Sequence, residues 1–262
     1  MRIVVKVGTS TLAHAGGRLN IRRVELLCKV LSDLKNAGCE VVLVSSGAIG
    51  MGVGKLGLPG RPADMPGKQA AAAVGQCELM YTYDKLFGEY NHTVAQILLT
   101  ADDIQDPRRS GYVHDTLERL LSLGALPIVN ENDAVAVDEI GIHTTIGEND
   151  SLSAIVAKLV NADTLVLLSD IDGLYTADPR KDPDATLIPV VETITPEIIA
   201  LAGGAGSALG SGGMATKLKA AQIATEAGID MMITNGENPE NLYALLEGQS
   251  IGTRFIGRRE EA

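Results

Sequence analysis

The chain has 262 residues, of which 45% are hydrophobic and 21% charged, with a formal net charge of −11 at pH 7. This composition is typical of a folded globular protein, and the acidic balance argues against a general nucleic-acid binder, which needs Lys and Arg to neutralise phosphates. Apolar runs stay well short of the ~18 residues of a membrane span, so we predict a cytoplasmic protein with neither membrane nor nucleic-acid partners.

The first elements are read from hydrophobic periodicity. Residues 3–7 are almost entirely apolar and β-branched, which is typical of a strand buried on both faces, and residues 8–10 follow as a turn. Apolar residues at helical spacing predict a helix from Ile21 to Leu34, capped by Asn20 and ended by Gly38. The same patterns predict further strands over 40–44, 93–99, 125–129, 164–168 and 230–234, and helices over 69–87, 115–123, 151–159, 196–202, 218–227 and 242–247.

The alternation of strands and helices predicts an α/β fold, with a mainly parallel central sheet sandwiched between helix layers. We expect residues 1–262 to form a single domain. Residues 130–145 lack helical periodicity and are interpreted as a hairpin excursion, and residues 170–185 as a loop. Ligands of such sheets bind beyond the C-terminal ends of the strands. Polar residues collect at those predicted ends, at 6–10, 45–47, 130–133 and 169–170.

Two lysines point to a phosphate ligand. Lys217 ends a glycine-rich run, 203–217, that leads into a predicted helix, and backbone N–H groups at a helix N-terminus favour anions. A mobile surface linker is the alternative interpretation of this run. Lys6 lies in a strand of the buried type, where an unpaired lysine is rare, so it either reaches solvent or faces a bound anion.

Two clusters of Asn, Asp and Glu flank the predicted excursion. Residues 130–133 are consistent with a turn and residues 147–151 with a helix cap, but together they favour a polar substrate pocket. The three cysteines and four histidines show no metal-ligand spacing, so no protein-held metal is predicted. Residues 52–57 match GxGxxG, yet they do not directly follow a strand, and we interpret the match as chance.

In order along the chain, these motifs resemble those of the amino acid kinase family. The Lys–Gly–Thr–Ser element at 6–10 and the Gly–Gly–Met–x–Thr–Lys element at 212–217 are typical of the family as a whole. The elements Glu–Asn–Asp–Ala–Val and Asn–Asp–x–Leu–Ser–Ala resemble more narrowly its glutamate 5-kinase branch. Further matching segments are 45–49 and 172–180.

The resemblance implies an activity and a set of site residues. The reaction would be phosphorylation of the γ-carboxylate of L-glutamate by ATP to L-glutamyl 5-phosphate, the first step of proline synthesis. Catalysis would rest on Lys6, Lys217 and Asp150, and substrate binding on Ser46, Asp133 and Asn149. The ATP-binding residues would be Lys6, Ser169, Asp170, Ser211, Gly212, Gly213, Met214 and Lys217.

The resemblance also implies cofactors and partners. Mg²⁺ would be carried by the ATP phosphates, and proline would act as a feedback inhibitor. We expect a homo-oligomer that is functionally coupled to glutamate-5-semialdehyde dehydrogenase. Many relatives carry a C-terminal PUA domain, and the chain departs from them because it stops soon after Phe255.

Three alternatives stay open on the sequence. Acetylglutamate kinase, carbamate kinase, UMP kinase and aspartokinase share the family lysines. An oxidoreductase would rest on residues 52–57. A proline-responsive sensor without catalysis is a third possibility, although the presence of Lys6, Asp150 and Lys217 argues against it.

Overall fold

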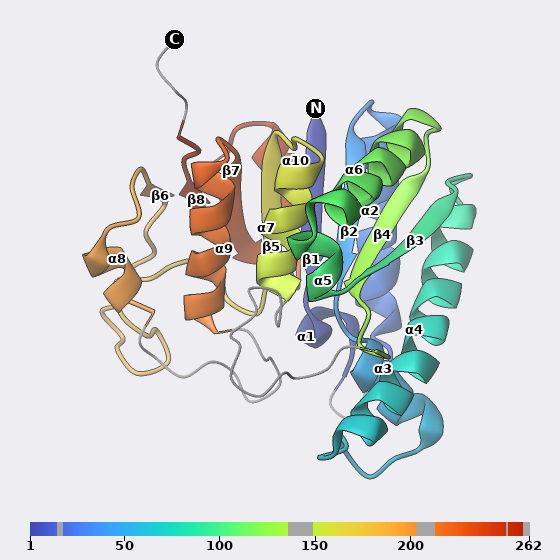
Figure 1. Ribbon diagram of the computed structural model, residues 1–262. Coiled ribbons are helices and arrows are strands. Elements are labelled where there is room, and N and C mark those ends of the chain that lie inside the picture. Colours follow the sequence, from blue (N-terminus) through green and yellow to red (C-terminus); the bar gives the residue numbers. More distant parts are fainter. Residues whose placement is uncertain (15–17, 136–148, 203–212, 250, 259–262) are drawn as a thin grey trace.

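A central sheet with helices on both faces forms the molecule, as seen in a computed structural model that describes residues 1–14, 18–135, 149–202, 213–249 and 251–258 (Figure 1). The strand order in the described part is β3-β4-β2-β1-β5-β7-β8-β6. The strands are β1 (Arg2–Val7), β2 (Glu40–Ser45), β3 (Val94–Leu99), β4 (Leu126–Glu131), β5 (Thr164–Ser169), β6 (Val190–Val191), β7 (Asp230–Asn235) and β8 (Thr253–Phe255). The helices are α1 (Thr9–Leu12), α2 (Ile21–Asn36), α3 (Ala48–Leu56), α4 (Met65–Gly88), α5 (Ala101–Gln105), α6 (Pro107–Ser122), α7 (Asn149–Leu159), α8 (Pro196–Ala200), α9 (Met214–Glu226) and α10 (Asn241–Leu246).

The sheet is parallel except at one pair of strands. β1 pairs in parallel with β2 on one side and with β5 on the other. The antiparallel pair in the described part is β7 with β8, and β6 runs parallel to β8. The predicted α/β fold with a mainly parallel sheet is therefore confirmed. None of the helices in the described part of the chain is long and apolar enough to cross a membrane.

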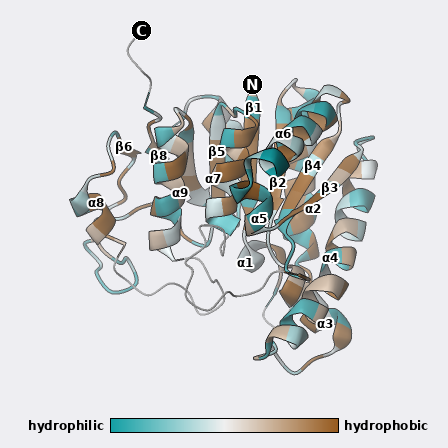
Figure 2. Ribbon diagram, viewed as in Figure 1, coloured by the Kyte–Doolittle hydropathy of each residue, from teal (hydrophilic) through white to brown (hydrophobic). Residues whose placement is uncertain are grey.

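Alternation along β1 decides which helices its side chains meet. Ile3, Val5 and Val7 pack on one face against α2 and α4, whereas Val4 faces a second apolar cluster that includes residues of α7 and α9. Because the side-chain period of a strand is two, Lys6 lies on the same face as Val4. Figure 2 shows the apolar colouring concentrated on the strands between these helix layers.

Several element boundaries differ from the predictions. The helix predicted over 115–123 begins at Pro107, where the Asp106 side chain accepts hydrogen bonds from the N–H groups of Arg108 and Arg109. A short helix, α1, replaces the predicted turn at residues 8–10, and α9 begins at Met214 rather than at 218. The helix α3 and the short elements α5, β6 and β8 were not predicted. The excursion over 130–145 and the glycine run over 203–212 fall largely or wholly outside the described residues.

Glycines allow α3 and α4 to approach closely. A Cβ atom on Gly52 would lie 1.8 Å from the backbone oxygen of Ala71, and one on Gly75 would lie 1.8 Å from that of Ala48. Gly52 thus lies inside α3, where it contacts the neighbouring helix. It does not lie at a strand-to-helix turn of the kind that binds dinucleotides. The interpretation of the GxGxxG match as chance agrees with this packing.

Candidate active site

The candidate site lies where the chain leaves β1. From this central strand, β2, β4 and β3 extend to one side of the sheet, and β5, β7, β8 and β6 to the other. Open α/β sheets bind ligands at such a reversal, beyond the C-terminal strand ends. In Figure 1 these ends lie at the lower edge of the sheet, where α1 follows β1.

A buried carboxylate lies between two lysines at this place. Lys6 Nζ lies 2.6 Å from Asp150 Oδ1, and Lys217 Nζ lies 3.1 Å from Asp150 Oδ2. Thr216 Oγ1 also donates a hydrogen bond of 2.8 Å to Asp150 Oδ2. The exposed fractions are 9% for Lys6, 1% for Asp150 and 5% for Lys217. Three charged groups are therefore held together in a place that water hardly reaches.

The charges of the cluster do not cancel. Burial raises the pKa of Asp150, but the attraction of Lys6 and Lys217 outweighs it and lowers that pKa to about 2. Asp150 is thus ionised at neutral pH. Two ammonium groups against one carboxylate leave one positive charge in excess, in surroundings where charges interact strongly. Such a cluster is suited to an anionic ligand.

Helix ends position the cluster. Asp150 lies in the first turn of α7, where the helix dipole favours a carboxylate. Lys217 lies in the first turn of α9, which begins after Gly213 without a side-chain cap. Both helices pack over the sheet face that carries Lys6, and α7 and α9 are in direct contact. The structure thus brings together three residues far apart in the sequence.

The predicted substrate residues Ser46 and Asn149 touch one another. Asn149 Nδ2 donates a hydrogen bond of 2.9 Å to Ser46 Oγ and a longer one, 3.2 Å, to Asn130 Oδ1. Since Asn149 directly precedes Asp150, the amide network is joined to the lysine cluster. The third predicted residue, Asp133, follows β4 and makes no hydrogen bond with Ser46 or Asn149. Burial raises its pKa, and the nearby charge of Arg61 opposes that rise.

Of the predicted ATP residues, Lys6 lies on β1 itself, and Ser169 and Asp170 lie at the end of the neighbouring strand β5. Ser169 ends β5, and its hydroxyl donates to Asp170 Oδ1 at 3.2 Å, while Arg180 reaches Asp170 Oδ2 at 3.5 Å. Gly213 and Met214 form the start of α9. The two remaining predicted contacts, Ser211 and Gly212, lie outside the described residues.

Three residues of the network, Thr216, Asn130 and Gln76, were not among the predicted site residues. Asn130 lies in the polar cluster 130–133 that favoured a substrate pocket on the sequence. Thr216 directly precedes Lys217 in the motif, so its role could have been inferred. Gln76 lies in an alanine-rich helix and is 8% exposed. The available signal was its place in the buried stripe formed by Ala72, Leu79 and Tyr83, where a polar residue needs a partner.

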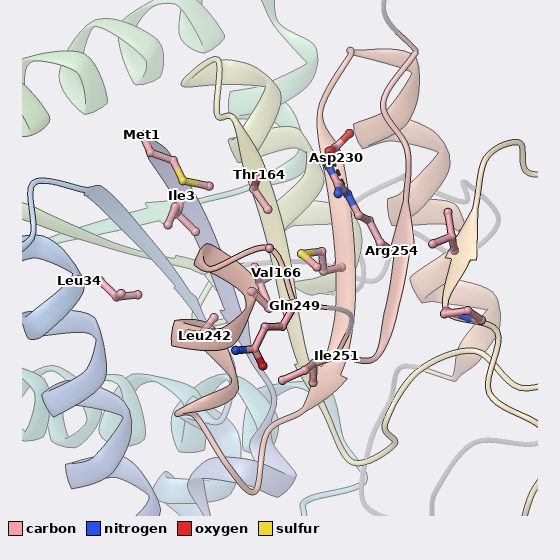
Figure 3. Close-up of a pocket in the computed structure, with 15 residues that line it drawn as sticks. Met1, Ile3, Leu34, Thr164, Val166, Asp230, Leu242, Gln249, Ile251 and Arg254 are labelled. Atoms are coloured by element: carbon pink, nitrogen blue, oxygen red, sulfur yellow. Dashed lines mark hydrogen bonds and ion pairs between the residues drawn. The ribbon is translucent and has the colours of Figure 1, made fainter.

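A separate cavity of about 260 Å³ opens at the opposite end of the strands (Figure 3). Met1, Thr164 and Asp230 mark the strand starts that line it, and Leu34 and Leu242 belong to its largely apolar wall. Its charged pair, Asp230 and Arg254, is joined by a hydrogen bond of 3.2 Å from Arg254 Nε. This cavity is remote from the lysine cluster and is not a candidate for phosphoryl chemistry.

Comparison with known proteins agrees with the fold. The model of the amino acid kinase family matches residues 1–235, and the chain belongs to that family. Glutamate 5-kinase of Clostridium perfringens (strain 13 / Type A) is 57% identical over 260 residues, covering 99% of this chain and 97% of the relative. Glutamate 5-kinase of Listeria monocytogenes serotype 4a (strain HCC23) is 54% identical, covering 99% and 94%. Within the family, the chain belongs with the glutamate 5-kinases.

Solved structures share the fold at much lower identity. The T. acidophilum isopentenyl phosphate kinase product complex has a TM-score of 0.66 at 21% identity and covers 97% of this chain and 100% of that one. Carbamate kinase from Giardia lamblia bound to AMP-PNP has a TM-score of 0.69 at 17% identity, covering 97% and 98%. At these identities the likeness concerns the fold alone.

Proposed function

We propose that the Lys6–Asp150–Lys217 cluster transfers the γ-phosphoryl group of ATP to the γ-carboxylate of L-glutamate, giving L-glutamyl 5-phosphate and ADP. In a glutamate 5-kinase this is the first step of proline synthesis. The observation that carries the mechanism is the pair of buried lysine ammonium groups held by one carboxylate, at 2.6 and 3.1 Å.

The chemistry of phosphoryl transfer to a carboxylate explains how two lysines can catalyse it without a general base. A carboxylate is already ionised at neutral pH, so it needs no general base to attack phosphorus. The obstacle is repulsion between two anions, and catalysis therefore consists of positioning and charge neutralisation. At ~4 Å and an effective dielectric constant of ~20, each pair of unit charges interacts by about 4 kcal/mol. Asp150 keeps both ammonium groups at one place and leaves one excess positive charge for the transferring phosphoryl group.

Substrates would enter from the two sides of β1. Ser46 and Asp133 follow β2 and β4, and Asn149 begins α7; these three residues would hold glutamate. Burial raises the pKa of Asp133 although the charge of Arg61 opposes the rise, and a substrate ammonium group bound beside it would further favour the ionised carboxylate. Ser169 and Asp170 would contact ATP from the end of β5. The segment that precedes Lys217 would also contact ATP, through Ser211, Gly212, Gly213 and Met214.

Mg²⁺ would arrive with ATP. Asp150 is the acidic side chain at the centre of the site, and both of its oxygens already face lysine ammonium groups, so the residues present fit a metal held by phosphate oxygens. When bound, Mg²⁺ would neutralise part of the phosphate charge.

Further properties are carried over from the resemblance. We propose proline as a feedback inhibitor, a homo-oligomeric assembly and a cytoplasmic location. We also propose coupling to glutamate-5-semialdehyde dehydrogenase, because the acyl phosphate product is readily hydrolysed and must be consumed quickly. We also propose that residues 1–262 form one domain, which is supported by a single sheet whose strands run from Arg2 to Phe255.

A hydroxamate assay tests the substrate assignment. Hydroxylamine traps acyl phosphates, so the purified chain with ATP and Mg²⁺ should form the hydroxamate with L-glutamate and far less with aspartate or N-acetylglutamate. Release of ADP with carbamate or UMP is measured in parallel, and each reaction is repeated with proline, which should reduce turnover of glutamate. Activity on aspartate or UMP but not on glutamate would overturn the assignment.

A further inference from the structure

A chain of buried side-chain amides runs from α4 to the start of α7. Asn130 Nδ2 donates to Gln76 Oε1 at 2.9 Å, and Asn149 Nδ2 donates to Asn130 Oδ1 at 3.2 Å. Gln76 is 8% exposed and Asn130 1%. Gln76 therefore connects the body of the fold to Asn149, two hydrogen bonds away.

The orientation of all three amides follows from one backbone group. The N–H of Glu131 can only donate, and it donates to Asn130 Oδ1 at 2.9 Å. Asn130 must then direct its Nδ2 toward Gln76, which must present Oε1 to it. Asn149 must likewise present Nδ2 to Asn130 Oδ1. The Glu131 N–H thereby sets Asn130, and Asn130 sets the amide orientation of both Gln76 and Asn149.

This order leaves an acceptor without a donor at the substrate end. Asn149 Oδ1 is buried and has no hydrogen-bond partner among the residues that the structure describes, and the same holds for Gln76 Nε2 at the far end. An unpaired buried polar atom is costly, so it is usually a place where a ligand or water binds. Oxygen acceptors bind N–H donors, and glutamate carries one such group, its α-ammonium.

We propose that Gln76 is a positioning residue which, through Asn130, holds Asn149 with its amide oxygen as the acceptor for the substrate's ammonium group. The inference rests on the proposed glutamate kinase function and adds a residue that selects for the amino group. Gln76 itself does not need to touch the substrate. Loss of its Oε1 leaves Asn130 Nδ2 buried and unpaired, so Asn130 is no longer held in place from the α4 side and its contact with Asn149 is weakened.

Substitution of Gln76 separates this role from a structural one. Gln76→Met keeps the volume but removes the acceptor, and should raise the KM for glutamate about 5- to 100-fold, as expected for an unpaired buried donor, while the KM for ATP stays unchanged. Gln76→Glu retains an oxygen that can accept from Asn130 and should restore the KM for glutamate to near the wild-type value. Leu79→Ala, one turn further along α4 in the apolar core, is the control for destabilisation and should lower the unfolding temperature without changing the KM for glutamate.

Glutarate, which is glutamate without its amino group, provides the decisive comparison. Wild type should prefer glutamate over glutarate, measured by kcat/KM or by the competitive inhibition constant of glutarate, and Gln76→Met should reduce that preference about tenfold or more. The proposal would be overturned if folded Gln76→Met kept the wild-type preference for glutamate over glutarate. It would also be overturned if Gln76→Met and Gln76→Glu lost that preference equally. If wild type does not phosphorylate glutamate at all, the proposed function fails first, independently of Gln76.

Discussion

Asp150 shows how a single carboxylate can organise a site. Its two oxygens separate the roles of the lysines, since Oδ1 faces Lys6 and Oδ2 faces Lys217 and Thr216. Breaking a buried ion pair by removing one partner is costly because the remaining charges lose their compensation. The same contacts that prepare the site for phosphate therefore also contribute to the stability of the fold.

The pH dependence of stability should reveal this contribution. The pKa of Asp150 is lowered from 3.8 to about 2, which corresponds to about 2 kcal/mol of free energy of unfolding. Since the folded-state pKa is the lower one, the contribution is complete above pH 4 and is lost as the pH falls through about 2. The difference in free energy of unfolding between wild type and Asp150→Asn, from urea titrations, should be constant from pH 7 to 5 and shrink by about 2 kcal/mol towards pH 2. A difference that does not vary with pH would contradict the lowered pKa.

Elements differ in how far the sequence could predict them. The buried strand at Ile3–Val7 and the capped helix from Ile21 were predicted closely because apolar periodicity and the Asn20 cap agree. The start of α6 was missed, since Pro107, Arg108 and Gly111 suggest a break and only the Asp106 cap indicates a helix. β6 and β8 have two and three residues, too few for any periodicity, and they form because neighbouring strands supply their hydrogen bonds.

The proximity of the candidate site residues could be predicted where each lies in a distinctive segment of the sequence. Lys6, Asp150 and Lys217 each lie in a distinctive segment, and parallel-sheet topology places strand ends together. Gln76 could not be found in this way, because its partner Asn130 is 54 residues distant, and no local pattern specifies such a contact.

The crossing of α3 and α4 gives a prediction at the scale of elements. Gly75→Ala would place Cβ 1.8 Å from the backbone oxygen of Ala48, so the helices must separate, at a cost of about 1–3 kcal/mol in the free energy of unfolding. Gly111→Ala in α6 is the matched control: a Cβ there meets nothing within 4 Å, and better helix propensity should stabilise by about 0.5–1 kcal/mol. Both are measured by chemical denaturation. Equal effects of the two substitutions would refute the close helix contact.

At the scale of the whole molecule, the phosphoryl site joins both halves of the sheet. β2 and β4 lead to the amide network on one side of β1, while β5 and α9 carry Lys217 and the described residues proposed to bind ATP on the other. The net charge of −11 would repel anionic substrates, so the local excess of one positive charge at Lys6, Asp150 and Lys217 is what makes the site suitable for phosphate. The central claim is that this buried charge stabilises the transferring phosphoryl group.

Turnover by Lys217→Met tests that claim most directly. The substitution keeps most of the length of the side chain and removes its charge. Lys219→Met, on the exposed face of the same helix, is the control. With saturating ATP, Mg²⁺ and glutamate, the hydroxamate assay should show kcat reduced at least about a hundredfold in Lys217→Met, because about 4 kcal/mol of charge interaction is lost, and unchanged kcat in Lys219→Met. Near-normal kcat in folded Lys217→Met would contradict the account and remove this lysine from the phosphoryl site.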